Sequence, residues 1–206
     1  TGTAVAATGA WNPLVGSSDE PATISDTPVP AELTAKLGVL RRDQTAQDRS
    51  AEVEATLDGG EALPTGVRLD AVRYLAPAPN GEATILLSGV DTSPIFTEEE
   101  PLCVARPFFG DQRAVSLCFG LSMLMSGDAR GLLIDASGAA TALGIVPDGV
   151  ATVTAEFGSA PDRTVSVTNN YWELSLGGAE LSNANGESGV QATVWRDADG
   201  NVVPHQ

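Results

Sequence analysis

Residues 139–157, AATALGIVPDGVATVTAEF, contain two strand-like runs joined by a turn that fixes where the chain reverses. Pro147 restricts its own φ, and Gly149 supplies the positive φ that a tight turn requires. From Val150 to Phe157, apolar and polar residues alternate, which is the period of a β-strand with one buried face. This stretch therefore predicts antiparallel strands rather than helices.

Short runs of the same kind recur on both sides of this stretch, and Gly, Pro, Asn and Asp separate them. Asn80-Gly81 lies between the runs 67–75 and 82–87, which is typical of a β-hairpin. Residues 197–200, Asp-Ala-Asp-Gly, separate two further runs near the end of the chain. About eight to ten short strands with turns between them predict a mainly β fold, either an antiparallel β-sandwich or a barrel-like sheet.

The region before residue 61 has a different pattern. Pro30 suits the first position of a helix, and three leucines follow it at helical spacing, namely Leu33, Leu37 and Leu40. The sequence predicts one or two short helices here, ended by Gly59-Gly60. The expected organisation is an extended N-terminal arm (1–29), a helical segment (30–60) and a β-rich domain (61–206).

The composition excludes two classes of partner. The chain has 206 residues, with 11 basic and 27 acidic side chains, and its net charge is −16. Nucleic acids and anionic membranes are polyanions and would be repelled. No apolar run approaches the roughly 18 residues that a transmembrane helix needs. We therefore expect no nucleic-acid partner and no transmembrane segment.

The two cysteines indicate an oxidising compartment. Cys103 and Cys118 lie in apolar, strand-like runs on either side of residues 106–113, which include Pro107 and Gly110. A hairpin would place the two strands side by side, so we expect a disulfide; two free buried thiols are the alternative. The chain begins at Thr1, which fits a secreted or cell-surface protein whose signal peptide has been removed.

Several segments together resemble a group of secreted actinobacterial proteins of unknown function. The most specific segments are Val146-Pro147-Asp148-Gly149-Val150-Ala151 and Asn169-Asn170-Tyr171, and the resemblance covers roughly residues 33–203. The chain departs from that group in its N-terminal arm and in the loop 183–188. The resemblance implies export and a compact β-rich domain, and it implies no activity and no catalytic residues.

The sequence contains no recognisable catalytic or cofactor motif. The one histidine, His205, is next to the last residue and more typical of a frayed tail than of a catalytic base. We expect no catalytic, cofactor-binding or metal-binding residues. Paired carboxylates of a hydrolase such as a carbohydrate-active enzyme are an alternative, drawn from Glu98, Glu99, Glu100, Glu156 and Glu173.

A calcium-dependent binding module is a further alternative. Asp197, Asp199 and Asn201 alternate as in the first half of a calcium loop, but no downstream glutamate follows them. An ordinary turn explains the same residues and is the interpretation that we favour.

The expected function is that of a non-enzymatic structural or protein-interaction module that assembles through its N-terminal arm. Its partner would be another protein, a second copy of the chain or a glycan. The candidate interaction residues are Trp11, Tyr171 and Trp172. Adjacent residues of a strand face opposite sides of the sheet, so we expect one of Tyr171 and Trp172 in the core. The other is either exposed to a partner or packed in the core, and core packing is the default for each.

Overall fold

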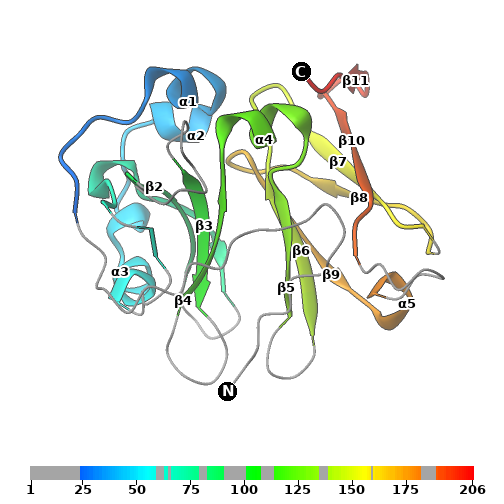
Figure 1. Ribbon diagram of the computed structural model, residues 1–206, viewed down its shortest axis with the longest axis horizontal. Helices are drawn as coiled ribbons and strands as arrows, with labels where there is room; N and C mark the ends of the chain where they lie inside the picture. The colour runs from blue at the N-terminus through cyan, green and yellow to red at the C-terminus, as the bar shows by residue number, and fades with distance from the viewer. Residues whose placement is uncertain are drawn as a thin grey trace. The chain divides into compact units, whose positions relative to one another are not determined.

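The computed structural model describes residues 24–58, 63–64, 66–78, 83–90, 101–107, 114–134, 139–158, 160–181 and 189–206. In this part of the chain the fold is mainly β, with three antiparallel sheets and several short helices (Figure 1). The predicted fold class is confirmed. None of the sheets formed by the described strands closes into a barrel.

The described chain forms two compact units. Among the described residues, one unit extends from residue 24 to residue 122, and the other extends from residue 123 to residue 206. The helical segment belongs to the same unit as the first four strands, and the later strands form a second unit of their own. The two are called the helical unit and the sandwich unit below.

The helical unit contains one four-stranded sheet with the order β1-β2-β3-β4, in which neighbours are antiparallel. Its strands are β1 (Arg73–Pro77), β2 (Ala83–Ser88), β3 (Leu102–Pro107) and β4 (Ala114–Phe119). Its helices are α1 (Ala31–Lys36), α2 (Gly38–Arg41) and α3 (Ala51–Asp58), with 3-10 turns η1 (Gln47–Arg49) and η2 (Leu69–Ala71). The pairing of β1 with β2 confirms the predicted hairpin, and its Asn80-Gly81 turn lies outside the described residues.

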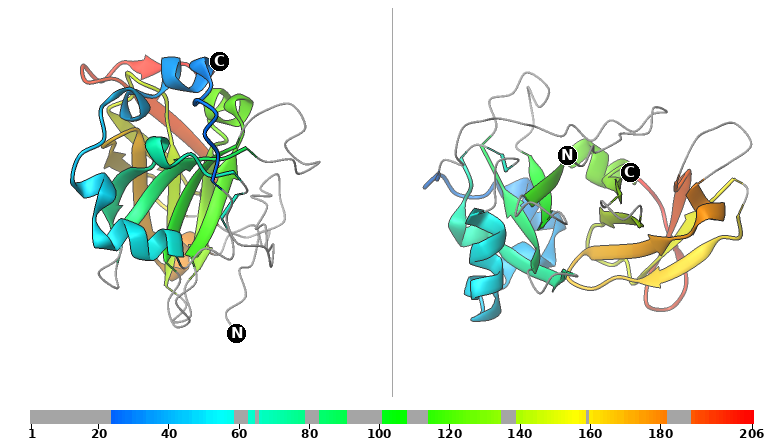
Figure 2. Two further views of the ribbon diagram at one scale, coloured as in Figure 1. Left: turned by 90° about the vertical axis from the view of Figure 1, so that its left-hand side faces the viewer. Right: turned by 90° about the horizontal axis from the view of Figure 1, so that it is seen from below.

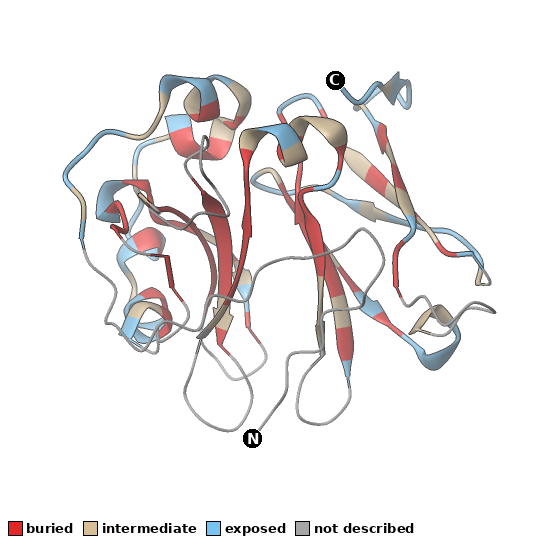
Figure 3. Cartoon of the chain, in the orientation of Figure 1, coloured by how far each residue is buried: buried red, intermediate tan, exposed pale blue. Residues whose placement is uncertain are grey.

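Helix α3 covers one face of this sheet (Figure 2, left). Val53 packs into a cluster with Ile85 and Leu87 of β2 and with both cysteines. The strands are buried along most of their described length (Figure 3). The expected apolar stripe of the helical segment is also confirmed, because Leu33, Leu37 and Leu40 are all buried.

The sandwich unit holds two sheets, with the orders β5-β6-β9 and β11-β10-β7-β8. The first has strands β5 (Arg130–Ile134), β6 (Ala140–Ile145) and β9 (Tyr171–Leu176). The second has strands β7 (Thr152–Glu156), β8 (Arg163–Ser166), β10 (Ala192–Arg196) and β11 (Val202–Val203). The short helix α5 (Gly178–Leu181) also belongs here, and α4 (Leu121–Ser126) contains the point where the two units divide.

One apolar core joins the two sheets of the sandwich unit. Ala142 of β6 and Trp172 of β9 lie in the same cluster as Val153 of β7 and Trp195 of β10. Buried residues alternate along β7, as the sequence predicted for residues 150–157, and they also alternate along β10. The predicted turn at Pro147-Asp148-Gly149 is present, and Gly149 has a φ of +88°.

The C-terminal residues are tied to the sandwich unit. The ring of His205 lies 4.2 Å from that of Trp195, measured between centroids, and the Gln206 backbone N–H donates to the Met125 carbonyl at 2.9 Å. The expectation of a frayed tail is therefore wrong, because an aromatic contact and a backbone hydrogen bond hold it. No described helix is both long enough and apolar enough to cross a membrane.

Candidate functional site

A pocket of about 370 Å³ lies on the helical unit, between η1, α3 and η2. Its apolar lining comes from two residues of α3, one of η2 and the first residue after η2, namely Val53, Leu57, Leu69 and Val72. Val53 and Val72 are buried, whereas Leu69 is 45% exposed. Its polar lining comes from Gln44, Asp48, Arg49, Glu54 and Asp70. The site thus combines an apolar floor with charged groups at its edge.

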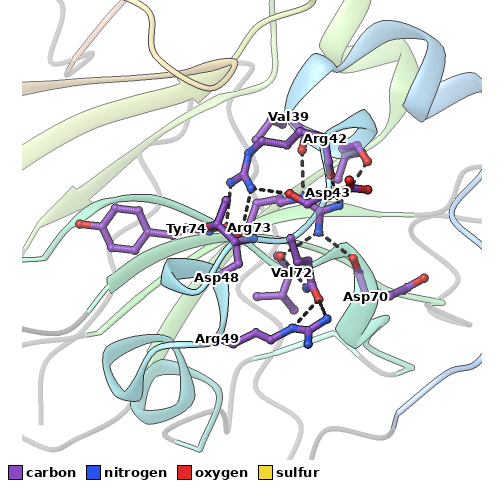
Figure 4. A network of polar contacts seen from close by, with 12 residues as sticks. Val39, Arg42, Asp43, Asp48, Arg49, Asp70, Val72, Arg73 and Tyr74 are labelled. Carbon is purple, nitrogen blue, oxygen red and sulfur yellow. Dashed lines mark hydrogen bonds and ion pairs between the residues drawn. The ribbon is translucent and has the colours of Figure 1, made fainter.

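An ion pair between Arg42 and Asp48 holds η1, which forms one side of the pocket, in place. The Asp48 carboxylate accepts hydrogen bonds from Arg42 Nη1 at 2.5 Å and Nη2 at 2.8 Å (Figure 4). It also accepts from the Thr45 backbone N–H, the Thr45 hydroxyl and the Tyr74 backbone N–H. Burial alone would raise the pKa of Asp48, but the donors from Arg42, Thr45 and Tyr74 outweigh it and hold the pKa well below its usual range.

Arg73, the first residue of β1, joins this strand to α2 through backbone carbonyls. Its guanidinium donates to the backbone carbonyls of Val39, Leu40, Asp70, Val72 and Arg42, at distances from 2.6 to 3.3 Å. Desolvation by burial lowers the pKa of Arg73, and the neighbouring charge of Arg42 acts in the same direction. In contrast, the hydrogen bond from Arg42 to Asp48 raises the pKa of Arg42. Arg42 and Arg73 thus fix the positions of η1, η2 and β1 relative to α2.

Gln44 connects the backbone around η2 to the side chain of Arg49. Its amide nitrogen donates to the carbonyls of Leu69 at 2.8 Å and Val72 at 3.1 Å. Its amide oxygen accepts from Arg49 Nε at 3.0 Å and Nη2 at 2.8 Å. These bonds hold the guanidinium of the exposed Arg49 at the pocket, and Figure 4 shows them as dashed lines from Arg49.

The solvent-facing charges of the pocket come from three residues. Arg42 neutralises Asp48, which leaves Arg49, Glu54 and Asp70 as the charges that meet solvent at the edge. Among the lining residues there is no histidine, cysteine or serine that would serve as a base or nucleophile. In the described part of the chain, no group of three or more His, Cys, Asp or Glu side chains is arranged to hold a metal ion.

The candidate residues from the sequence lie elsewhere. Cys103 and Cys118 form the expected disulfide between directly opposite positions of β3 and β4, so the free-thiol alternative is wrong. Trp11 lies outside the described residues. Tyr171 and Trp172 belong to the sandwich unit, and neither takes part in the pocket.

Both of these aromatic residues are buried, so the default of core packing is confirmed and the alternative of one exposed ring is wrong. Tyr171 is 4% exposed and Trp172 is 2% exposed. Trp172 belongs to the core between the two sheets, whereas the Tyr171 hydroxyl donates to the Glu173 carboxylate at 2.7 Å on the other face of β9. Both faces of the strand are covered at this point, so alternation does not produce an exposed ring.

The residues that resemble half of a calcium loop form a turn. Asp197 Oδ1 accepts from the backbone N–H groups of Asp199 and Asn201, both at 2.9 Å, and Gly200 has a φ of +85°. The hydrogen bond from the Asn201 side chain, together with these backbone donors, lowers the pKa of Asp197. The turn interpretation is confirmed.

Sequence reasoning missed the pocket and its supporting contacts. The Arg41-Arg42 pair is explained at the sequence level by the favourable position of cations at a helix end. The one local signal was Asp48 three residues after Thr45, which resembles a capping box. In the structure one of the two capping-box bonds is present, because the Asp48 carboxylate accepts the Thr45 backbone N–H. The Thr45 hydroxyl also donates to this carboxylate.

Comparison with known proteins gives no relative: no family model, no curated protein and no solved structure matches this chain. The resemblance to secreted actinobacterial proteins therefore stays a prediction.

Proposed function

We propose that this protein is a secreted or cell-surface, non-enzymatic protein-interaction module and that the pocket between η1, α3 and η2 is its partner site. The observation that carries the proposal is the apolar floor of this pocket, which is bordered by charged side chains on a rigid support. Ligand sites commonly combine a mostly apolar lining with a few fixed polar groups. The Cys103–Cys118 disulfide supports an oxidising compartment.

Charge indicates the chemistry of the partner. The whole chain carries −16, and the exposed carboxylates of Glu54 and Asp70 add local negative charge at the pocket edge. A basic partner would be attracted over a long range and a strongly acidic one repelled. We therefore expect a short, positively charged polypeptide segment that inserts one apolar side chain between Val53, Leu57 and Leu69.

The test is a binding titration with defined peptides. A pentapeptide with one leucine among lysines and alanines is added to the ¹⁵N-labelled full chain, and amide shifts are followed. We expect saturable shifts at residues 44–72, and none with a peptide in which glutamates replace the lysines. Because a buried leucine contributes about 1.5–3 kcal/mol, replacing the pocket's own leucine should weaken binding about tenfold.

The variant for this test is Leu69→Asn, and its matched control is Val202→Asn. Both residues are exposed apolar side chains, but Val202 lies in β11 of the sandwich unit. The proposal requires that only the first substitution weakens binding. Equal affinity of the two variants, or the absence of shifts at the pocket with every peptide, would show that this is not the partner site.

The arm is a second element that supports an interaction role. The described chain begins at Ile24, which pairs in parallel with Val67, and the Ser25 N–H donates to the Val67 carbonyl at 3.0 Å. Residues 1–23 therefore precede a segment that adds to the fold by strand-like pairing, as in β-strand addition between chains. Assembly through the arm predicts that deletion of residues 1–23 lowers the mass measured by light scattering to that of one chain.

A further inference from the structure

The Arg49 guanidinium is held in a fixed direction with donors to spare. Its Nε and Nη2 both donate to the Gln44 amide oxygen, at 3.0 and 2.8 Å. A guanidinium carries five N–H donors, and these bonds use two of them. Within the described residues Arg49 Nη1 makes no hydrogen bond, and the side chain is exposed. The remaining donors are therefore available to a ligand.

Gln44 is the residue that orients this guanidinium. Both of its amide hydrogens are used, since the nitrogen donates to the carbonyls of Leu69 and Val72. The amide oxygen must then face Arg49, because an exchange of the two amide atoms would lose both carbonyl bonds. Arg49 loses less rotamer freedom on binding than an unsupported exposed arginine would.

An arginine fork beside an apolar floor matches a carboxylate attached to an apolar group. Arg49, Val53 and Leu69 line the same pocket, and its volume of about 370 Å³ lies at the small end of ligand sites. Guanidinium and carboxylate groups pair through two parallel N–H···O bonds. The last residue of a polypeptide offers both parts, an apolar side chain and a free carboxylate, on one carbon atom.

The other charges of the pocket favour a peptide over a simple organic acid. Glu54 and Asp70 lie at the same edge and would repel a ligand that is only anionic. A C-terminal apolar residue preceded by a basic residue places positive charge near these two carboxylates and its own carboxylate near Arg49. The ligand is thus complementary to both signs of charge.

We propose that the pocket binds the free C-terminus of a basic polypeptide that ends in an apolar residue, with Arg49 as the carboxylate contact and Gln44 as the residue that positions it. The proposal rests on the partner site proposed above. It adds the chain terminus and the two residues that recognise it.

The experiment compares two forms of one probe. The peptide Ala-Lys-Ala-Lys-Leu, acetylated at its N-terminus, is prepared with a free carboxylate and with a C-terminal amide. Both are titrated by calorimetry into the full chain. Because charge-assisted bonds to the carboxylate are lost in the amide, we expect the acid to bind at least about tenfold more tightly.

The variants test each residue's role. Arg49→Gln should bring the acid down to the affinity of the amide, whereas Arg196→Gln, which alters an exposed arginine of the sandwich unit, should leave the ratio unchanged. Arg49→Lys should retain part of the preference, since it keeps the charge but loses the fork. Gln44→Ala should reduce the ratio of the acid's affinity to the amide's affinity, while the amide form still binds. A general loss of pocket structure would instead weaken the binding of both forms.

Two outcomes would overturn the inference, and they are distinguishable. Equal binding of acid and amide at the pocket removes the role of the carboxylate but leaves the partner site intact. Absence of binding by both forms, with no amide shifts at residues 44–72, removes the partner site and this inference together.

Discussion

The carboxylate of Asp48 and the guanidinium of Arg42 form a two-fold hydrogen-bonded ion pair in which the Asp48 side chain has no exposed surface. The same carboxylate accepts the backbone N–H of Tyr74, 26 residues further along the chain. One side chain therefore joins the end of α2, the turn η1 and the strand β1. This arrangement makes Asp48 the polar centre of the helical unit.

Replacing Asp48 should strongly destabilise the helical unit. Asp48→Asn keeps the shape of the side chain but removes its charge and replaces an acceptor with a donor that faces Arg42. Breaking a buried ion pair by changing one partner costs about 3–5 kcal/mol. We expect a loss of about 3 kcal/mol, because Arg42 keeps some contact with water, measured by urea unfolding.

The matched control for this prediction is an ion pair in the sandwich unit. Glu180 accepts from Arg163 Nη1 at 2.8 Å, but the Arg163 side chain is 44% exposed. Exposed pairs contribute at most about 1 kcal/mol. Glu180→Gln should therefore change the urea midpoint far less than Asp48→Asn. Similar losses from both substitutions would contradict the central role of Asp48.

The same carboxylate should make the helical unit sensitive to acid. The pKa of Asp48 is lowered in the folded state, so its contribution to stability is complete above the unfolded pKa of about 3.9 and is lost as the pH falls below that value. Between pH 5 and pH 2, the unfolding free energy of the native chain should fall more steeply than that of Asp48→Asn. Parallel curves for the two chains would refute this assignment.

Local patterns predicted most of the strands. The alternation after Gly149 corresponds to β7, and the run around Cys103 pairs with the run around Cys118 as a hairpin should. Such pairs need only a short turn between neighbours in the chain, so local sequence specifies them. The division into two units was not predicted, because it depends on which sheets share a core.

The pocket depends on contacts that local patterns do not contain. Gln44 bonds to a carbonyl 25 residues away, and Asp48 bonds to a backbone N–H 26 residues away. Read alone, each polar residue of the segment 42–49 is typical of a helix end or a turn. Their joint role becomes visible only after η2 and β1 are placed against them.

The disulfide gives a prediction for the helical unit. Cys103 and Cys118 are 15 residues apart, and cross-linking a loop of this size stabilises a fold by about 3 kcal/mol in the chain-entropy model. The double variant Cys103→Ser/Cys118→Ser should lower the free energy of unfolding of the helical unit by about 3 kcal/mol, seen as a lower urea midpoint. Adding a reducing agent should lower the midpoint of the native chain and leave that of the variant unchanged. A native chain with the same midpoint with and without reductant would argue against this contribution.

The final prediction concerns the close approach of two strands in the sandwich unit. Gly144 of β6 lies so near its neighbours that an added Cβ would be 2.7 Å from the Ala129 carbonyl oxygen and 2.7 Å from Trp172 Nε1. That carbonyl accepts the backbone N–H of Ile145 at 2.9 Å, and Trp172 is enclosed in the core, so neither can move freely. Overpacking of this kind costs about 1–3 kcal/mol, and we expect Gly144→Ala to lose that much stability and to alter the fluorescence of Trp172.

Gly178→Ala is the control, since nothing lies within 4 Å of the position of its added Cβ in the first residue of α5. A variant at Gly144 as stable as the one at Gly178 would mean that β6 and β9 can separate slightly to admit a methyl group, and that the core of the sandwich unit is less closely packed than its contacts indicate.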